Sequence, residues 1–320
     1  MTVTLSDIHA ARHLIAGHVA ETPIIRDDAL SDALGHPVLL KCEYRQTTGA
    51  FKLRGATNAI LTRDVSRGVI TASTGNHGRA VAYAAQRLGV PATVCLSRLV
   101  PPDKVRAIRD LGADVRVIGA SQDEAMAEVI RAVSHDGMAY IPPFDDPAVV
   151  AGQGTIGLEI GTPAAVLVPL SGGGLAAGIA VAIKAISPAT RVIGLTMENG
   201  AAMAASLRAG RPVKVAETRS LADSLGGGIG VDNHVTFPLC RALLDDVILL
   251  TEAEIAEGIR HLGRAGHLVE GAGAVGTAAL LAGKVPTDIR ADGPIVTILS
   301  GGNIDPALHA RVMAGASEAA

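Results

Sequence analysis

The sequence lacks the features of a secreted, disulfide-bonded or zinc-stabilised protein. Its three cysteines, Cys42, Cys95 and Cys240, are odd in number and widely separated along the chain. This spacing argues against a disulfide framework or a zinc site and favours buried free thiols. The first residues show no basic segment followed by an apolar one, so a signal peptide is not expected.

Features of nucleic-acid and membrane binding are also scarce. Aromatic residues make up 2% of the chain, and 28 basic against 31 acidic residues give a net charge of −3. A nucleic-acid-binding surface would need a basic patch, which the sequence does not contain. No apolar run reaches the length of a membrane-spanning helix. We therefore expect a soluble, cytoplasmic protein that binds neither nucleic acid nor membranes.

The 320 residues, of which 48% are hydrophobic, alternate instead between short β-branched runs and longer alanine-rich amphipathic stretches. Strands that are apolar on both faces and alternate with helices predict parallel sheets covered by helices. A proline-rich break at 140–147 interrupts this alternation. We expect an α/β fold of two parallel-sheet domains with a cleft between them, since ligands of such folds bind at the carboxyl ends of the strands. The expected domains are a small one of residues 65–145 and a large, discontinuous one of residues 1–64 plus 146–320.

The stretch TTGAFKLRGA, residues 47–56, sets Lys52 between Phe51 and Leu53. A lysine is rarely buried, because its ammonium loses hydration. The simplest interpretation is a helix lysine that lies along apolar surface with its charged end in solvent. In an apolar pocket, however, its pKa would fall, and the neutral amine would be a nucleophile towards a carbonyl group.

Residues 169–186 read as a strand, a turn of small residues Ser171–Gly174, and a helix. Glycines allow close approach of the backbone, and the helix N-terminus suits a phosphate group. The pattern Gly172, Gly174 and Ala177, with Glu198 after the next strand, also fits a nicotinamide-dependent dehydrogenase. A tight turn that only packs on its neighbour is the purely structural alternative.

A second polar turn follows the strand that ends near residue 72. Ser73, Thr74, Asn76 and His77 surround Gly75, which is more polar chemistry than a helix cap needs, so the turn suits a carboxylate. The stretch LSGGNID, residues 299–305, follows the last expected strand and is weak evidence alone. A nucleophilic lysine, a phosphate turn and a carboxylate turn together predict pyridoxal phosphate and an amino-acid substrate.

The chain resembles the fold-type II pyridoxal-phosphate enzymes, in particular the threonine/serine dehydratase and serine racemase family. The motifs that carry this resemblance occur in the same order along the chain: TTGAFKLRGATNAI, STGNHGRAVAYAA, SGGGLAAGIA, VEGAGAVGTAAL and LSGGNID. The resemblance implies a tryptophan synthase β-like fold, pyridoxal 5'-phosphate as cofactor, a small amino-acid substrate and a homodimer.

The resemblance also implies a role for each motif. Lys52 would form the Schiff base with the cofactor and move the proton at the substrate α-carbon, with Phe51 against the ring. Asn76 would hydrogen-bond the 3-oxygen of the ring, Ser300 would face the pyridine nitrogen, and Glu270 would lie near the cofactor. The residues expected to bind the phosphate through backbone N–H groups are Ser171, Gly172, Gly173, Gly174 and Leu175. The residues expected to bind the substrate carboxylate are Ser73, Thr74, Gly75, Asn76 and His77.

Three departures from the family pattern bear on the substrate. Thr74 keeps a hydroxyl where many threonine dehydratases have alanine and serine racemase has a catalytic serine, so racemisation stays open. Ala204 stands where metal-activated racemases carry an acid that joins a glutamate at the position of Glu198, so we expect no metal site. In SLADSLGGGIG, residues 220–230, Ser224 replaces a glycine, and this segment is similar to a subgroup associated with hydroxyectoine utilisation.

The sequence therefore predicts a pyridoxal-phosphate-dependent lyase. It would eliminate water from a 3-hydroxy amino acid, either threonine or serine or a hydroxyectoine-derived hydroxy diamino acid, and release a 2-oxo acid and ammonia. An amino-acid racemase on the same scaffold is the nearest alternative. A nicotinamide-dependent dehydrogenase and a non-catalytic amino-acid sensor are alternatives of other classes.

Overall fold

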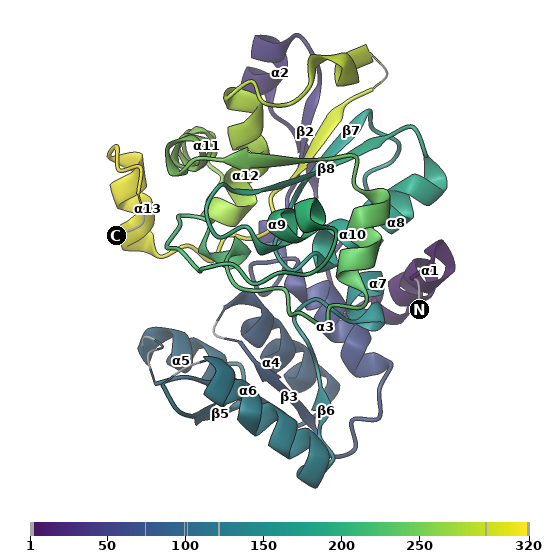
Figure 1. The fold of residues 1–320 in the computed structure, drawn as a ribbon, viewed down its shortest axis with the longest axis vertical. Helices are drawn as coiled ribbons and strands as arrows, with labels where there is room; N and C mark the ends of the chain where they lie inside the picture. The colour runs from purple at the N-terminus through teal and green to yellow at the C-terminus, as the bar shows by residue number, and fades with distance from the viewer. Residues whose placement is uncertain are drawn as a thin grey trace.

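The structure is a computed structural model that describes residues 3–73, 75–98, 100, 102–120, 122–291 and 293–318. The two sheets lie in separate lobes, with helices α3 and α7 between them (Figure 1). The thirteen helices within the described ranges are α1 (Leu5–Ile15), α2 (Asp28–Leu34), α3 (Lys52–Leu61), α4 (Asn76–Leu88), α5 (Pro102–Arg109), α6 (Gln122–Arg131), α7 (Pro147–Gly154), α8 (Gly174–Ile186), α9 (Ala202–Ala209), α10 (Thr236–Leu243), α11 (Glu252–Arg264), α12 (Gly271–Leu281) and α13 (Pro306–Met313).

The larger sheet has six strands in the order β1-β2-β10-β7-β8-β9. Strand β1 runs antiparallel to β2, and the other neighbours are parallel. The strands are β1 (Ile24–Arg26), β2 (Val38–Lys41), β7 (Ala165–Pro169), β8 (Arg191–Met197), β9 (Asp246–Leu250) and β10 (Ile295–Ile298).

The smaller sheet has four parallel strands in the order β5-β4-β3-β6. They are β3 (Val69–Ala72), β4 (Ala92–Leu96), β5 (Asp114–Val117) and β6 (Ala139–Tyr140). The α/β fold with two parallel sheets is thereby confirmed. The domain boundaries near residues 65 and 145 stay a prediction.

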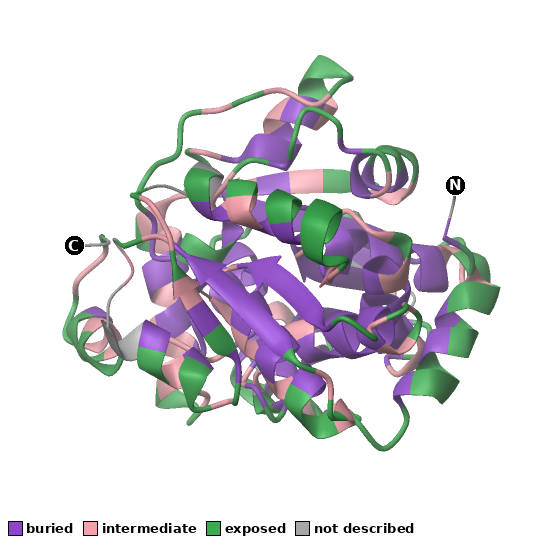
Figure 2. Ribbon diagram, turned by 90° about the horizontal axis from the view of Figure 1, so that it is seen from below, coloured by how far each residue is buried: buried purple, intermediate pink, exposed green. Residues whose placement is uncertain are grey.

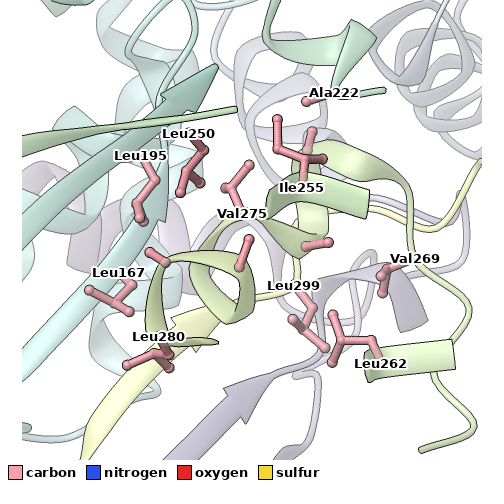
Figure 3. Packing of buried hydrophobic residues seen from close by; sticks show 14 of the residues in the cluster. Leu167, Leu195, Ala222, Leu250, Ile255, Leu262, Val269, Val275, Leu280 and Leu299 are labelled. Carbon is pink, nitrogen blue, oxygen red and sulfur yellow. The ribbon is translucent and has the colours of Figure 1, made fainter. Parts of the chain in front are cut away.

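The central strands are buried on both faces because helices cover each side. All residues of β3, β4, β7 and β10 are buried, and Figure 2 shows buried strands beneath helices whose exposed faces point outwards. Two helices, α11 and α12, pack on one face of the larger sheet, while α8 packs on the other. Figure 3 shows the first of these contacts, in which side chains of β7, β8 and β9 meet those of α11 and α12: Leu167, Leu195, Leu250, Ile255, Leu262, Val275 and Leu280.

A buried cluster of charged side chains anchors α3 to the larger lobe. The guanidinium of Arg54 donates to both oxygens of Glu43, at 2.8 and 2.9 Å, and also to Glu159. Lys41 binds Glu159 from β2. The side chains of all four residues are at most 5% exposed. Because Lys52 is the first residue of α3, this cluster fixes the helix that carries it.

The state of the cysteines agrees with the prediction from their spacing. All three cysteines are free and buried, as expected. None of the described helices is both long and apolar enough to span a membrane. The described residues contain no group of three or more His, Cys, Asp or Glu side chains arranged to bind a metal.

Candidate active site

Lys52 begins α3 at the point where this helix meets the last strand of the larger sheet. The backbone N–H of Phe51 donates to the carbonyl oxygen of Ser300 at 3.0 Å, so the segment after β10 holds the start of the helix. The Nζ atom of Lys52 donates to the carbonyl oxygen of Pro143 at 2.6 Å and lies 5.3 Å from the centre of the Phe51 ring. The structure therefore brings Phe51, Lys52 and Ser300 together.

The environment of Lys52 favours its neutral form. Burial of the ammonium lowers the pKa of Lys52 to about 8, although the charge of Glu270 opposes this shift. A carbonyl oxygen such as that of Pro143 does not compensate an ammonium as a carboxylate would. At pH 8 about half of the Lys52 side chains carry a neutral, nucleophilic amine.

The turn between β7 and α8 requires glycine at two positions. A Cβ on Gly172 would lie 2.3 Å from the ring of Phe144. Gly173 has φ +88° and forms the N-cap of α8, and a Cβ there would lie 2.7 Å from Met203. The N–H groups of the first helical turn, residues Gly174 to Ala176, have no partner within the helix. This end of α8 therefore presents free donors and a positive dipole to an anion.

The carboxylate turn lies between β3 and α4. The Oγ atom of Ser73 accepts from the N–H of Gly75 at 3.4 Å. His77 is buried and its Nε2 lies 2.9 Å from the carbonyl oxygen of Ile141. Burial and the charge of Lys52 lower the pKa of His77 to about 3, so its ring is neutral and its Nε2–H donates. Thr74 lies outside the described residues.

Asn76, the first residue of α4, belongs to a chain of hydrogen bonds across the site. Its Nδ2 donates to Glu270 at 2.7 Å, and its Oδ1 accepts from Asn303 at 2.7 Å. Burial and the nearby charge of Asp223 raise the pKa of Glu270 to about 7. The side-chain amide of Asn76, which is expected to face the cofactor ring, thus also donates a hydrogen bond to Glu270, whose pKa is close to neutrality.

A pocket opens beside these residues. Asn76 and Arg79 of α4 line it from the smaller lobe, and Asp223, Ser224 and Glu270 line it from the larger lobe. Its position between the two lobes agrees with the cleft expected from the sequence.

Several contributors to the site were not identified from the sequence. In the sequence, residues 143–145 belong to a proline-rich break with no predicted function. In the structure, Pro143 accepts a hydrogen bond from Lys52, and Phe144 packs against Gly172. Asp145 accepts from the N–H groups of His234, Val235 and Thr236 at the start of α10. Arg79 and Asn303 were also missed, although both lie inside motifs that the sequence analysis quotes.

The chemistry of these residues fits pyridoxal phosphate. A desolvated amine suits the aldehyde of the cofactor, and a glycine turn at a helix N-terminus suits its phosphate. Glu198, the acid required by the dinucleotide interpretation, is exposed at the end of β8 and its N–H binds Leu250.

Comparison with known proteins supports the same cofactor. Residues 15–301 match the family model described as pyridoxal-phosphate dependent enzyme. A protein from Sinorhizobium fredii that is provisionally named a threonine dehydratase is 56% identical, covering 98% of this chain and 96% of its own. The catabolic L-threonine dehydratase TdcB from Escherichia coli is 40% identical, covering 95% and 94%.

A solved structure agrees with these sequence relatives. Maize serine racemase superposes with a TM-score of 0.91 at 33% identity, and the match covers 98% of each chain. The family match spans most of the chain, and the resemblance inferred from the motifs is confirmed. The chain belongs to the family of pyridoxal-phosphate-dependent enzymes.

Proposed function

We propose that the protein eliminates water from a 3-hydroxy amino acid such as threonine or serine and releases a 2-oxo acid and ammonia. The observation that carries this proposal is the amine of Lys52, whose pKa is lowered to about 8 and which donates to Pro143, the residue before the Phe144 that packs against the glycine turn. The names of the Escherichia coli and Sinorhizobium fredii relatives support threonine as a substrate.

Pyridoxal phosphate, when bound, withdraws electrons from the substrate α-carbon and so acidifies its proton. Lys52 would hold the cofactor through Nζ and, when released from it, would take that proton. The N–H groups of Ser171–Leu175 would hold the phosphate. The hydroxyl of Ser300 would face the pyridine nitrogen. Unlike a carboxylate, a neutral hydroxyl would not keep this nitrogen protonated, which favours elimination over transamination.

The turn Ser73–His77 would bind the substrate carboxylate through N–H groups at the start of α4. The neutral ring of His77 stabilises this turn through its hydrogen bond to the carbonyl oxygen of Ile141. Thr74 is the candidate for proton transfer on the opposite face of the α-carbon. That role would make the protein a racemase as well as a dehydratase.

A second candidate substrate is a hydroxylated diamino acid of the kind expected in hydroxyectoine utilisation. It rests on the segment 220–230, which contributes Asp223 and Ser224 to the lining of the pocket between the lobes. The homodimer and the cytoplasmic location stay predictions.

The test is to purify the protein with its cofactor, reduce it with borohydride and map the modified lysine. We expect labelling at Lys52, and 2-oxo acid and ammonia from threonine or serine. Lys52→Ala should lower the rate of product formation by about a thousandfold or more, whereas Lys214→Ala, at an exposed lysine, should retain it. A label on another lysine, or product formation by Lys52→Ala at a rate close to that of the wild type, would overturn the proposal. A racemase would instead give the D-isomer of the substrate, which chiral analysis detects.

A further inference from the structure

The pocket between the lobes carries opposite charges on its two walls. Arg79 lines it from α4, and Asp223 and Ser224 line it from the facing loop. We refer to it as the Arg79–Asp223 pocket. It adjoins Gly75 and Asn76, so it begins where the substrate carboxylate would be bound.

Arg79 brings its guanidinium to this pocket, and one hydrogen-bond donor of that group is unused. Its Nε atom is buried and has no hydrogen-bond partner in the part of the chain that the structure describes. A buried donor without a partner is costly, and a guanidinium offers five N–H groups in a fixed fork. Arg79 stands three residues after Asn76, so both side chains lie on the same face of α4. Because Arg79 lines the pocket, a ligand there would meet its guanidinium with an acceptor.

The opposite wall offers acceptors as well as a donor. Asp223 and Ser224 are exposed, and the hydroxyl of Ser224 donates to Asp223 at 3.3 Å. Glu270 also lines this pocket, and the charge of Asp223 contributes to its raised pKa, so the two carboxyl groups interact. A ligand that reaches this wall would meet the carboxylate of Asp223 with a donor.

A group of one charge satisfies only one of these walls. A carboxylate would pair with Arg79 but would be repelled by Asp223, and an ammonium would pair with Asp223 but would be repelled by Arg79. A neutral group that both accepts and donates hydrogen bonds satisfies both walls without repulsion. An amide has this combination in one planar group.

We propose that the side chain of the preferred substrate ends in an amide, which accepts a hydrogen bond from Arg79 and donates one to Asp223. Arg79 is then a residue that determines specificity. This inference rests on the proposed function, since it takes the substrate to be a 3-hydroxy amino acid bound beside Asn76. It also disfavours the free amine of a hydroxylated diamino acid, which Arg79 would repel.

The test uses the holoenzyme and four probes that differ at the end of the side chain: threonine, 3-hydroxyasparagine, 3-hydroxyaspartate and 2,4-diamino-3-hydroxybutyrate. The readouts are kcat/KM and the Kd obtained from the absorbance change of the bound cofactor. We expect the amide to exceed each charged probe by about tenfold or more in both. Arg79→Gln should reduce the preference for 3-hydroxyasparagine over threonine by about 10- to 100-fold. Arg87→Gln, at an exposed arginine further along α4, should leave that ratio unaltered.

Three results would overturn the inference. These are a preference for the anionic probe, a preference for the cationic probe, and an equal loss for threonine and 3-hydroxyasparagine in Arg79→Gln, which would indicate a structural role. The proposed function fails differently. If no probe yields a 2-oxo acid but the absorbance titration still ranks the amide first, the elimination proposal fails and the pocket inference stands.

Discussion

The Nζ atom of Lys52 donates a hydrogen bond of 2.6 Å to the carbonyl oxygen of Pro143, which lies in the connection between the two lobes. The next residue, Phe144, contacts the turn at Gly172, and Asp145 binds the start of α10. One short segment therefore sets the lysine and the glycine turn relative to each other. The nucleophile and the phosphate turn are positioned by the same three residues.

The lowered pKa of Lys52 predicts how its cofactor-free form reacts with pyridoxal phosphate. Only the neutral amine attacks an aldehyde, so the attachment rate should rise as the pH passes the pKa of Lys52. Because that pKa is about 8, we expect a half-maximal rate near pH 8. The rate of absorbance change after mixing apoenzyme with cofactor, followed as a function of pH, measures this. A half-maximal rate near pH 10, the ordinary value for lysine, would contradict the prediction.

Gly172→Ala should weaken cofactor binding. The new Cβ would lie 2.3 Å from the ring of Phe144, so either the ring or the turn must move. We expect the Kd for pyridoxal phosphate to rise by about tenfold or more, about 1.4 kcal/mol. Equilibrium titration of the apoenzyme measures this Kd.

Two further variants separate this contact from a general effect of alanine. Gly228→Ala is the matched control, because a Cβ at Gly228 would meet no atom within 4 Å. Phe144→Leu combined with Gly172→Ala should recover part of the lost affinity, since the smaller side chain leaves room for the Cβ. Additive losses in the double variant would show that the two residues are not coupled.

Much of the fold follows from local patterns in the sequence. Strand β7 is apolar at every position and β4 at every position except Thr93, which indicates burial on both faces, and the structure buries every residue of both strands. The glycine turn after β7 is also local, because strand, turn and helix follow one another without interruption. These elements can be predicted from the sequence because they do not depend on contacts between distant residues.

The rest of the site depends on contacts between distant residues. Asn76 and Glu270 are 194 residues apart, and no local pattern indicates that they form a hydrogen bond. Pro143 acts on Lys52 through its carbonyl oxygen, so its side chain carries no signal of that contact. Arg79 reads as an ordinary helix residue until α4 is placed opposite the loop that contains Asp223.

Glu270 should make the stability of the apoenzyme depend on pH. Its pKa is raised from 4.5 to about 7 in the folded protein, so the folded state binds more protons than the unfolded state between these values. The contribution of Glu270 to the free energy of unfolding should therefore fall by about 2–3 kcal/mol as the pH rises from 5 to 7.5. The lowered pKa of His77 gives a contribution of opposite sign, so the difference between wild type and Glu270→Gln isolates the carboxyl group. Urea unfolding at the two pH values measures the change, and Glu270→Gln should remove this contribution.

Two variants test whether the environment of Glu270 causes this dependence. Asp223→Asn removes the neighbouring negative charge and should shift the pH dependence towards lower pH. Glu217→Gln, at an exposed glutamate, should not alter it. An identical pH dependence in wild type and Glu270→Gln would assign it to another group.

Removal of Arg54 should destabilise the protein far more than removal of a surface arginine. Its guanidinium is the shared partner of Glu43 and Glu159, and Arg54→Met would leave two buried carboxylates with Lys41 as their remaining cationic partner. Loss of one partner from a buried ion pair costs about 3–5 kcal/mol, because the remaining charge stays desolvated. Arg12→Met is the control, since Arg12 and Glu21 form an exposed pair at 3.8 Å that contributes little. Urea unfolding of both variants measures the difference. Equal stability of the two variants would show that the buried charged cluster does not hold α3.

Because α3 starts at Lys52, Arg54→Met should also raise the Kd for pyridoxal phosphate.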